Sequence, residues 1–164
     1  MIKIKIFYLI AFCTVISLYG CSGQQIKAPV YLGEMDNFNI NEKIEILNAL
    51  NDLNKNFNNS IFTIKKNKSS KIFFQLSEKT KKSANGNLAG TAMNLISSCK
   101  ITIFSVSWKD KIVKSVIWHE VGHCFGLEHS ENPDDIMYLS VKPFEKYTKE
   151  SVNTFLEDLK KNLK

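Results

Sequence analysis

Apolar side chains recur at two different spacings along this chain, and each spacing predicts a different kind of element. After a short predicted strand at 29–32, a spacing of three and four residues predicts a helix that Asn39 or Asn41 can cap. The apolar positions of this helix are Ile40, Ile44, Leu47, Leu50, Leu53 and Phe57. Because they share one side of a helix, we expect that side to pack against the rest of the domain.

Four short runs in the middle of the chain have the composition of strands. Residues 60–64 (SIFTI) and 71–76 (KIFFQL) are rich in isoleucine and phenylalanine. A polar stretch with an Asn-Gly pair, 77–87, then predicts a surface loop. Residues 88–93 (LAGTAM) and 99–106 (CKITIFSV) predict two further strands.

The helical spacing returns in the last third of the chain. Ser107 or Asp110 can start a helix, and Gly126 is placed to end it in a left-handed conformation. Its apolar positions are Ile112, Val113, Val116, Ile117, Val121, Cys124 and Phe125. A last helix is predicted from near Thr148, with Val152, Phe155, Leu156 and Leu159 as its buried stripe. This order predicts an α+β domain, with a mixed twisted sheet, a long helix, a second helix and a C-terminal helix.

The first twenty residues differ from the rest. Two lysines precede an almost wholly apolar run that is too short to span a membrane, which is typical of a secretory signal peptide over 1–20. The run ends in LYGC, which resembles a bacterial lipobox, and this predicts acylation of Cys21; ordinary cleavage would leave Cys21 as a thiol. Residues 21–28 would be a lipidated tether and 29–164 the folded domain. We therefore expect an exported lipoprotein, anchored in the membrane and facing the periplasm or the cell surface.

Composition narrows the class of protein without naming a partner. Apolar residues make up 44% and charged residues 23%, which indicates a globular chain rather than a disordered one. The net charge is +6, and every basic residue apart from the histidines is a lysine, which indicates a biased composition rather than a positive patch. No RNA-binding signature or phosphate-cradling glycine loop is present in the sequence, so we expect no nucleic-acid partner, and we expect a monomer.

Two cysteines remain in the predicted domain. Export would allow Cys99 and Cys124 to form a disulfide, and the alternative is two buried thiols. Closing this loop would stabilise the fold by roughly 3 kcal/mol through the entropy of the unfolded chain. On a helix Cys124 points about 100° away from the preceding residue, which makes it a poor candidate for a metal ligand.

The segment HEVGHCFGLEH, residues 119–129, holds all three histidines of the chain. His119 and His123 are four residues apart, so their rings leave one side of a helix and can reach one metal ion. Gly126 allows a sharp turn that brings His129 to the same ion. Three neutral imidazoles suit Zn²⁺ and leave a fourth position for water, while the alternative is exposed or hydrogen-bonded histidines without a metal. Glu120 can project beside this ion without binding it.

The same segment resembles the long zinc signature of the metzincin metallopeptidases. Ser130 after the third histidine, and Met137 in HSENPDDIMY, are similar to the matrixin branch, although Leu139 stands where matrixins commonly have proline. The resemblance implies that Met137 forms the floor of the site, in the Met-turn; the alternative is an ordinary core methionine. It also implies a zincin-like fold and one catalytic zinc ion, held by His119, His123 and His129.

The resemblance further implies hydrolysis of peptide bonds, with Glu120 as the general base for attack by water. The substrate, a protein or peptide, would pair with an edge strand. Our candidate for that strand is LAGTAM, with Ala89 and Gly90 near the scissile bond; an interior position for it is the alternative. Tyr138 is a further candidate for substrate binding, at the start of a pocket wall over 138–146.

Two other functions compete with the zinc endopeptidase. One is a surface lipoprotein that binds a partner and keeps zinc as a structural ion. The other is an amidase that acts on the peptides of peptidoglycan. The presence of Glu120 argues against the first, because a structural zinc site needs no base.

Overall fold

The computed structural model describes residues 30–33, 35, 37–58, 61–63, 72–77, 82–83, 86–87, 89–95, 98–109 and 111–163. The predicted signal peptide (1–20) and the tether (21–28) with Cys21 lie outside the described residues. The strands are β1 Val30–Tyr31, β2 Phe62–Thr63, β3 Ile72–Ser77, β4 Lys82–Ser83, β5 Gly86–Asn87, β6 Gly90–Asn94 and β7 Cys99–Phe104. The helices are α2 Ile40–Lys55, α3 Val106–Lys109, α4 Val113–Cys124 and α5 Lys149–Asn162, with a 3-10 turn at Phe144–Lys146.

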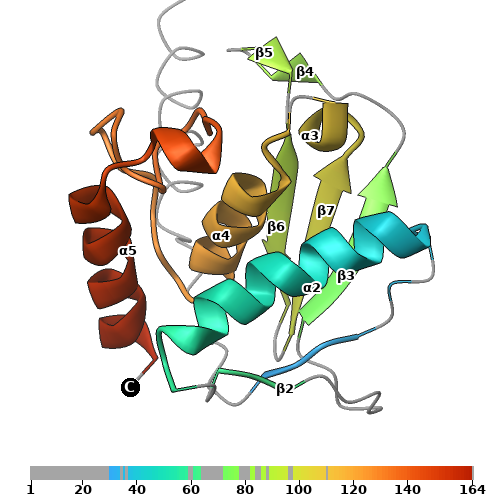
Figure 1. Cartoon of the computed structure of the whole chain (residues 1–164), viewed down its shortest axis with the longest axis horizontal. Coiled ribbons are helices and arrows are strands. Elements are labelled where there is room, and N and C mark those ends of the chain that lie inside the picture. Colours follow the sequence, from blue (N-terminus) through green and yellow to red (C-terminus); the bar gives the residue numbers. More distant parts are fainter. Residues whose placement is uncertain are drawn as a thin grey trace, which may run out of the picture.

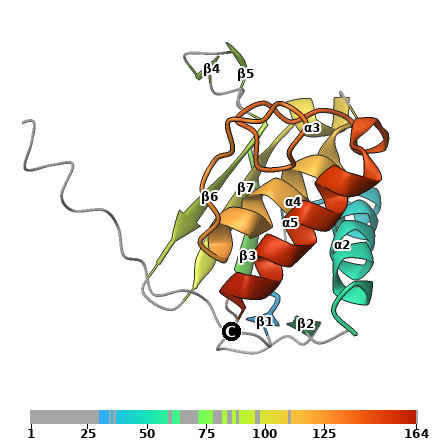
Figure 2. The same ribbon diagram turned by 90° about the vertical axis from the view of Figure 1, so that its left-hand side faces the viewer.

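A three-stranded mixed sheet forms the centre of the domain, in the order β3-β7-β6. Strand β7 pairs in parallel with β3 and antiparallel with β6. A bridge between Leu32 and Ile72 joins the parallel pair β1-β2 to the side of β3. The helices α2, α4 and α5 lie on one side of this sheet (Figures 1 and 2). The α+β arrangement expected from the order of elements is therefore confirmed.

Helix α2 begins where the sequence predicts, and Leu47, Leu50, Leu53 and Phe57 of the predicted stripe are buried or pack against the core, but the first two residues of that stripe do not. Asn39 is its N-cap, and a capping box joins Asn39 to Glu42. The buried residues are Ile46, Ala49, Leu50, Leu53 and Asn54. Ile40 and Ile44, which the apolar spacing assigned to the packed side, are 70% and 48% exposed. The packing partner sets the rotation of the helix, because α2 lies against α4 and the Ala49 carbonyl accepts a hydrogen bond from Trp118 Nε1 (3.0 Å).

Two other predictions need correction. The polar stretch predicted as a loop contains the antiparallel pair β4-β5, in which Lys82 pairs with Asn87 and Ser83 with Gly86. The helix predicted from Ser107 or Asp110 is two helices, α3 and α4, with Lys111 between them at a φ of 55°. A left-handed residue interrupts the helical path, so the helix with the histidines begins only at Val113.

The C-terminal helix α5 agrees with its prediction. Thr148 is the N-cap and accepts a hydrogen bond from the Ser151 N–H (3.1 Å). Phe155 and Leu159 are buried in the core that fills the space between the helices and the sheet. In the part of the chain that the structure describes, no helix is both long enough and apolar enough to span a bilayer.

Candidate metal centre and catalytic site

Helix α4 is the element that positions the candidate site. It is buried along nearly its whole length between α2 and the strands β6 and β7, which explains its apolar composition. Phe125 is its C-cap, and Gly126 follows with a φ of 87°, in the left-handed region expected for it. The chain then reverses, so that His129 returns to the helix that carries His119 and His123.

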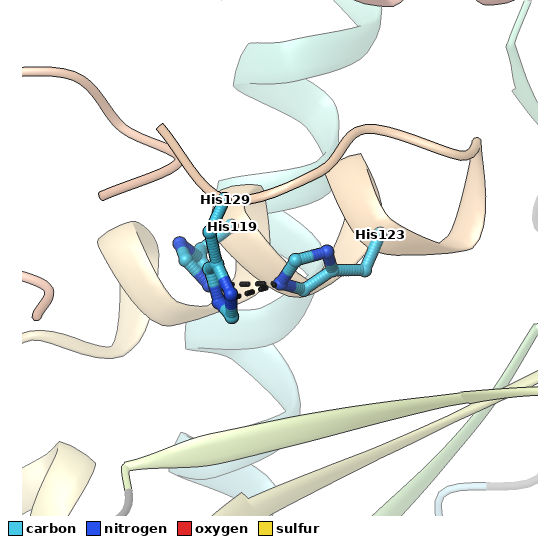
Figure 3. Close-up of side chains that lie close together, drawn as sticks. All are labelled: His119, His123 and His129. Carbon is cyan, nitrogen blue, oxygen red and sulfur yellow. Dashed lines mark hydrogen bonds between the residues drawn. The ribbon is translucent and has the colours of Figure 1, made fainter. Parts of the chain in front are cut away.

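The three imidazoles point toward one another (Figure 3). The Nε2 atom of His123 lies 3.1 Å from Nε2 of His119 and 3.1 Å from Nε2 of His129. All three candidate ligand atoms lie within 4.8 Å of one another. In a tetrahedral zinc site with Zn–N distances of about 2.1 Å, the nitrogen atoms are about 3.4 Å apart. The triad therefore has the spacing of a zinc site with three histidine ligands.

Backbone carbonyls fix the rings of two of these histidines. Nδ1 of His119 lies 2.8 Å from the Ile136 carbonyl oxygen, and Nδ1 of His123 lies 2.7 Å from that of Leu127. A carbonyl oxygen only accepts, so each Nδ1 carries the proton and each Nε2 presents a lone pair. Lone pairs on Nε2 atoms that are 3.1 Å apart repel one another unless a cation lies between them. The donor set thus fits a divalent metal ion, with the outer hydrogen bonds that usually orient histidine ligands.

Burial keeps the ligand atoms free of protons. It lowers the pKa of His119 to about 4, although the contact with the Ile136 carbonyl acts in the opposite direction. Burial also lowers the pKa of His123. Both rings are therefore neutral at pH 7, in the form that binds a metal ion.

Glu120 directly follows His119 on α4 and is only 5% exposed. Burial raises the pKa of its carboxyl to about 8, and the backbone N–H of Ala92 counteracts part of that rise. In the metal-free protein this carboxyl group is therefore largely protonated at neutral pH.

Strand β6 borders the site and is an edge strand among the described strands, where its pairing partner is β7. The Ala89 carbonyl accepts hydrogen bonds from the Phe104 N–H (2.9 Å) and the Ser107 hydroxyl (2.6 Å), so it is already used within the protein. Backbone groups alternate in direction along a strand, so those of Gly90 and Ala92 point away from β7. Of the two residues expected near the substrate, Gly90 is thus the one that presents free backbone groups.

Gly90 also makes room for the carboxyl group. A Cβ atom at this position would lie 2.8 Å from Oε1 of Glu120 and 2.6 Å from Cγ1 of Val116. Any larger residue would therefore push Glu120 out of its place. The sequence indicated a role for Gly90 but not this contact.

Met137 is buried directly against α4, the helix that carries His119 and His123 and is called the metal helix below. A Cβ atom on Gly122 would lie 2.5 Å from its Sδ atom, so the glycine of HEVGH allows the close approach of the methionine. The turn that holds Met137 is tied to the residue after His129, because Ser130 and Tyr138 form an isolated bridge. Tyr138 is half-buried at the end of this turn.

Cys99 and Cys124 form a disulfide, with 5.6 Å between their Cα atoms. This is the pairing that the sequence favoured. It joins α4 to the central strand β7 one residue after His123. Cys124 is consequently no metal ligand.

Three features of the site were missed in the sequence. Ala92 and Asn94 on β6 contact the metal helix, and the carbonyls of Ile136 and Leu127 orient the rings. The contacts of Ala92, Ile136 and Leu127 come from their backbones and leave no signal in the side chains, and the exposed amide of Asn94 is ordinary on a strand. Gly122 did carry a signal, because a glycine inside an apolar helix usually marks a close approach.

The raised pKa of Glu120 predicts a pH-dependent stability difference in the metal-free protein. Between pH 4.5 and about 8 the folded protein keeps a proton on Glu120 that the unfolded protein has released. The contribution of Glu120 to the free energy of unfolding is therefore complete below pH 4.5 and is lost as the pH rises through about 8. Glu120→Gln removes the titrating group. We expect Glu120→Gln to raise the free energy of unfolding above that of the wild type by more at about pH 8.5 than at about pH 5.5. The measurement is urea titration of both proteins with a chelator present. A gain that stays constant with pH would contradict the assignment.

Comparison with known proteins agrees with this geometry. The matrixin family matches residues 41–159, which include the sheet, the triad and most of α5. The viral protein named "Probable matrix metalloproteinase 095L", from Invertebrate iridescent virus 3, is 37% identical over 60 residues, or 36% of this chain. That stretch is 16% of the viral protein, so this chain spans a small part of its length. With the family matched over most of the chain, this protein belongs to the matrixins.

Proposed function

We propose that this protein is a zinc-dependent endopeptidase that hydrolyses peptide bonds in proteins outside the cytoplasm. Membership of the matrixin family supports metallopeptidase chemistry in general. The observation that carries the proposal is the buried carboxyl group of Glu120, which adjoins one of the three converging histidines in sequence and packs against the edge strand β6 at Gly90.

Each group in the site has a task in this reaction. When bound by His119, His123 and His129, zinc supplies Lewis-acid activation of water and of the scissile carbonyl. Glu120 accepts a proton from the attacking water and later donates it to the departing amine nitrogen. The N–H of Ala92 holds the carboxylate in place between these two transfers.

The substrate is held by the edge of the sheet. An extended peptide can pair with the outward-facing backbone groups of Gly90 and with the Ala92 carbonyl, as an added strand of the sheet. The Ala92 N–H is already bonded to Glu120. This pairing brings the scissile bond beside Glu120, because Gly90 is packed against that side chain. Tyr138 and the segment that follows it would form the opposite wall.

A structural zinc site in a binding module is the less favoured alternative. The buried carboxyl group of Glu120 has no ion-pair partner among the described residues and is therefore costly, and a site that only holds zinc would gain nothing from it. The peptidoglycan-peptide amidase differs only in its substrate, so activity assays must separate it from the endopeptidase.

The test compares hydrolysis of casein and of a mixed peptide library with release of peptides from cell walls. We expect cleavage of casein and of internal peptide bonds, loss of that activity with a chelator, and recovery after one equivalent of zinc. Cleavage of cell walls alone would favour the amidase. Tight zinc binding without any hydrolysis would favour the binding module.

Location is part of the same proposal and rests on the sequence of the first 21 residues. The lipobox-like LYGC supports an anchor at Cys21 and hence action at the periplasmic or outer surface. Labelling with radioactive palmitate should mark the protein and not its Cys21→Ala variant. Unlabelled protein would remove the anchor and leave the enzymatic proposal unaffected.

A further inference from the structure

Three residues on one side of β6 contact the metal helix at successive points. Gly90 packs against Val116 and Glu120, and the Ala92 N–H contacts the Glu120 carboxylate. Two residues further on, Asn94 Nδ2 donates a hydrogen bond to the His123 carbonyl oxygen (2.9 Å). The edge strand thus follows α4 from the candidate base to the second histidine.

The hydrogen bond from Asn94 reaches the last turn of α4. The last four carbonyls of a helix have no partner within the regular helix, and that of His123 is among them. It accepts the Gly126 N–H (3.0 Å) and Asn94 Nδ2. The ring of the same histidine is held by Leu127. The position of this ligand is therefore set by groups outside the helix.

The disulfide makes a different contact at this end of the helix. It ties Cys124 to Cys99 on the central strand β7, whereas Asn94 lies on β6, directly opposite Cys99 in the register. The disulfide fixes the helix relative to β7. At this end of the strand, the Asn94 side chain is what ties the helix to β6 among the described contacts.

We propose that Asn94 is a positioning residue, which sets the distance between the edge strand and His123 and so tunes both zinc affinity and hydrolysis. Without its amide, the last turn of α4 and the end of β6 can separate. The His123 ring would then move relative to the other two ligands, and the strand that pairs with the substrate would move relative to Glu120. The effect on hydrolysis rests on the proposed function, whereas the effect on zinc affinity does not.

The test uses two variants of the full chain and a matched control. Asn94→Ala removes the donor, and Asn94→Asp places a carboxylate, which cannot donate, against the His123 carbonyl. Asn94 is exposed, so neither change opens a cavity. The control is Asn56→Ala, since exposed Asn56 donates a similar bond from Nδ2 to the Asp52 carbonyl (2.8 Å) at the end of α2, which is not part of the site.

Zinc affinity is measured by competition with a coloured chelator, the site geometry by the visible spectrum of the Co²⁺-substituted protein, and hydrolysis by kcat and KM. Outer contacts that orient metal ligands typically account for 10- to 100-fold in metal affinity or activity. We expect Asn94→Ala to weaken zinc binding about tenfold, Asn94→Asp to weaken it further, and both to change the Co²⁺ spectrum. Asn56→Ala should change neither.

The inference would be overturned if both Asn94 variants kept the wild-type zinc affinity and Co²⁺ spectrum and lost only Tm, as Asn56→Ala is expected to. A wild-type protein that binds zinc but hydrolyses nothing would refute the proposed function instead. In that case the affinity and the spectrum still decide the role of Asn94.

Discussion

Glu120→Gln is expected to lower kcat by about 10²- to 10⁴-fold, the usual contribution of a general base. Glutamine has nearly the same shape and can still accept the hydrogen bond from the Ala92 N–H, but it cannot take a proton from water. The three imidazoles are untouched, so the variant should retain one equivalent of zinc. KM should change little, because the change removes an interaction made in the transition state.

The matched control is Glu131→Gln, which removes an exposed carboxylate from the loop that follows His129. It should leave kcat within a factor of about two, since exposed charges at this distance are screened. Zinc content and the cleavage of a peptide library are measured on all three proteins. A zinc-loaded Glu120→Gln variant with full activity would remove the assigned mechanism.

Replacement of both Cys99 and Cys124 by alanine is expected to lower the free energy of unfolding by about 3 kcal/mol. The disulfide closes a sequence separation of 25 residues, and its loss gives the unfolded chain more conformations. For a domain of this size the change corresponds to a decrease in Tm of about 10 °C. Both cysteines are buried, so the loss of packing adds to the effect.

The measurement is urea unfolding of zinc-loaded and zinc-free protein, with and without the double substitution. Since the disulfide holds the end of α4 to β7, zinc binding should also weaken in the double variant. If the double variant unfolds at the wild-type urea concentration in both states, the disulfide contributes nothing to the stability of the metal helix.

Much of the secondary structure could be predicted, because helix and strand spacing are local properties. The capping of α2, the strands β3 and β7, and the start of α5 at Thr148 all follow from neighbouring residues. The prediction that Ile40 and Ile44 are buried was wrong, because the apolar spacing shows which residues share a side of the helix but not which element packs against it. The break at Lys111 was missed because one backbone angle decides it.

The candidate site was predictable to the same extent. The spacing of His119, His123 and His129 around Gly126 requires only a helix and a sharp turn, and both are local. The sequence did not decide whether LAGTAM is an edge strand or an interior strand, since both can have the same composition; the structure places β6 at the edge of the described sheet.

The sequence by itself determined the three converging histidines and the helix that carries two of them, because these contacts span at most eleven residues. Only the tertiary structure decided the burial of Glu120, the free edge at Gly90 and the bond from Asn94 to His123. These depend on how β6 lies against α4, about thirty residues away along the chain. Such pairing is fixed by the packing of the whole core, and no short stretch of sequence contains it.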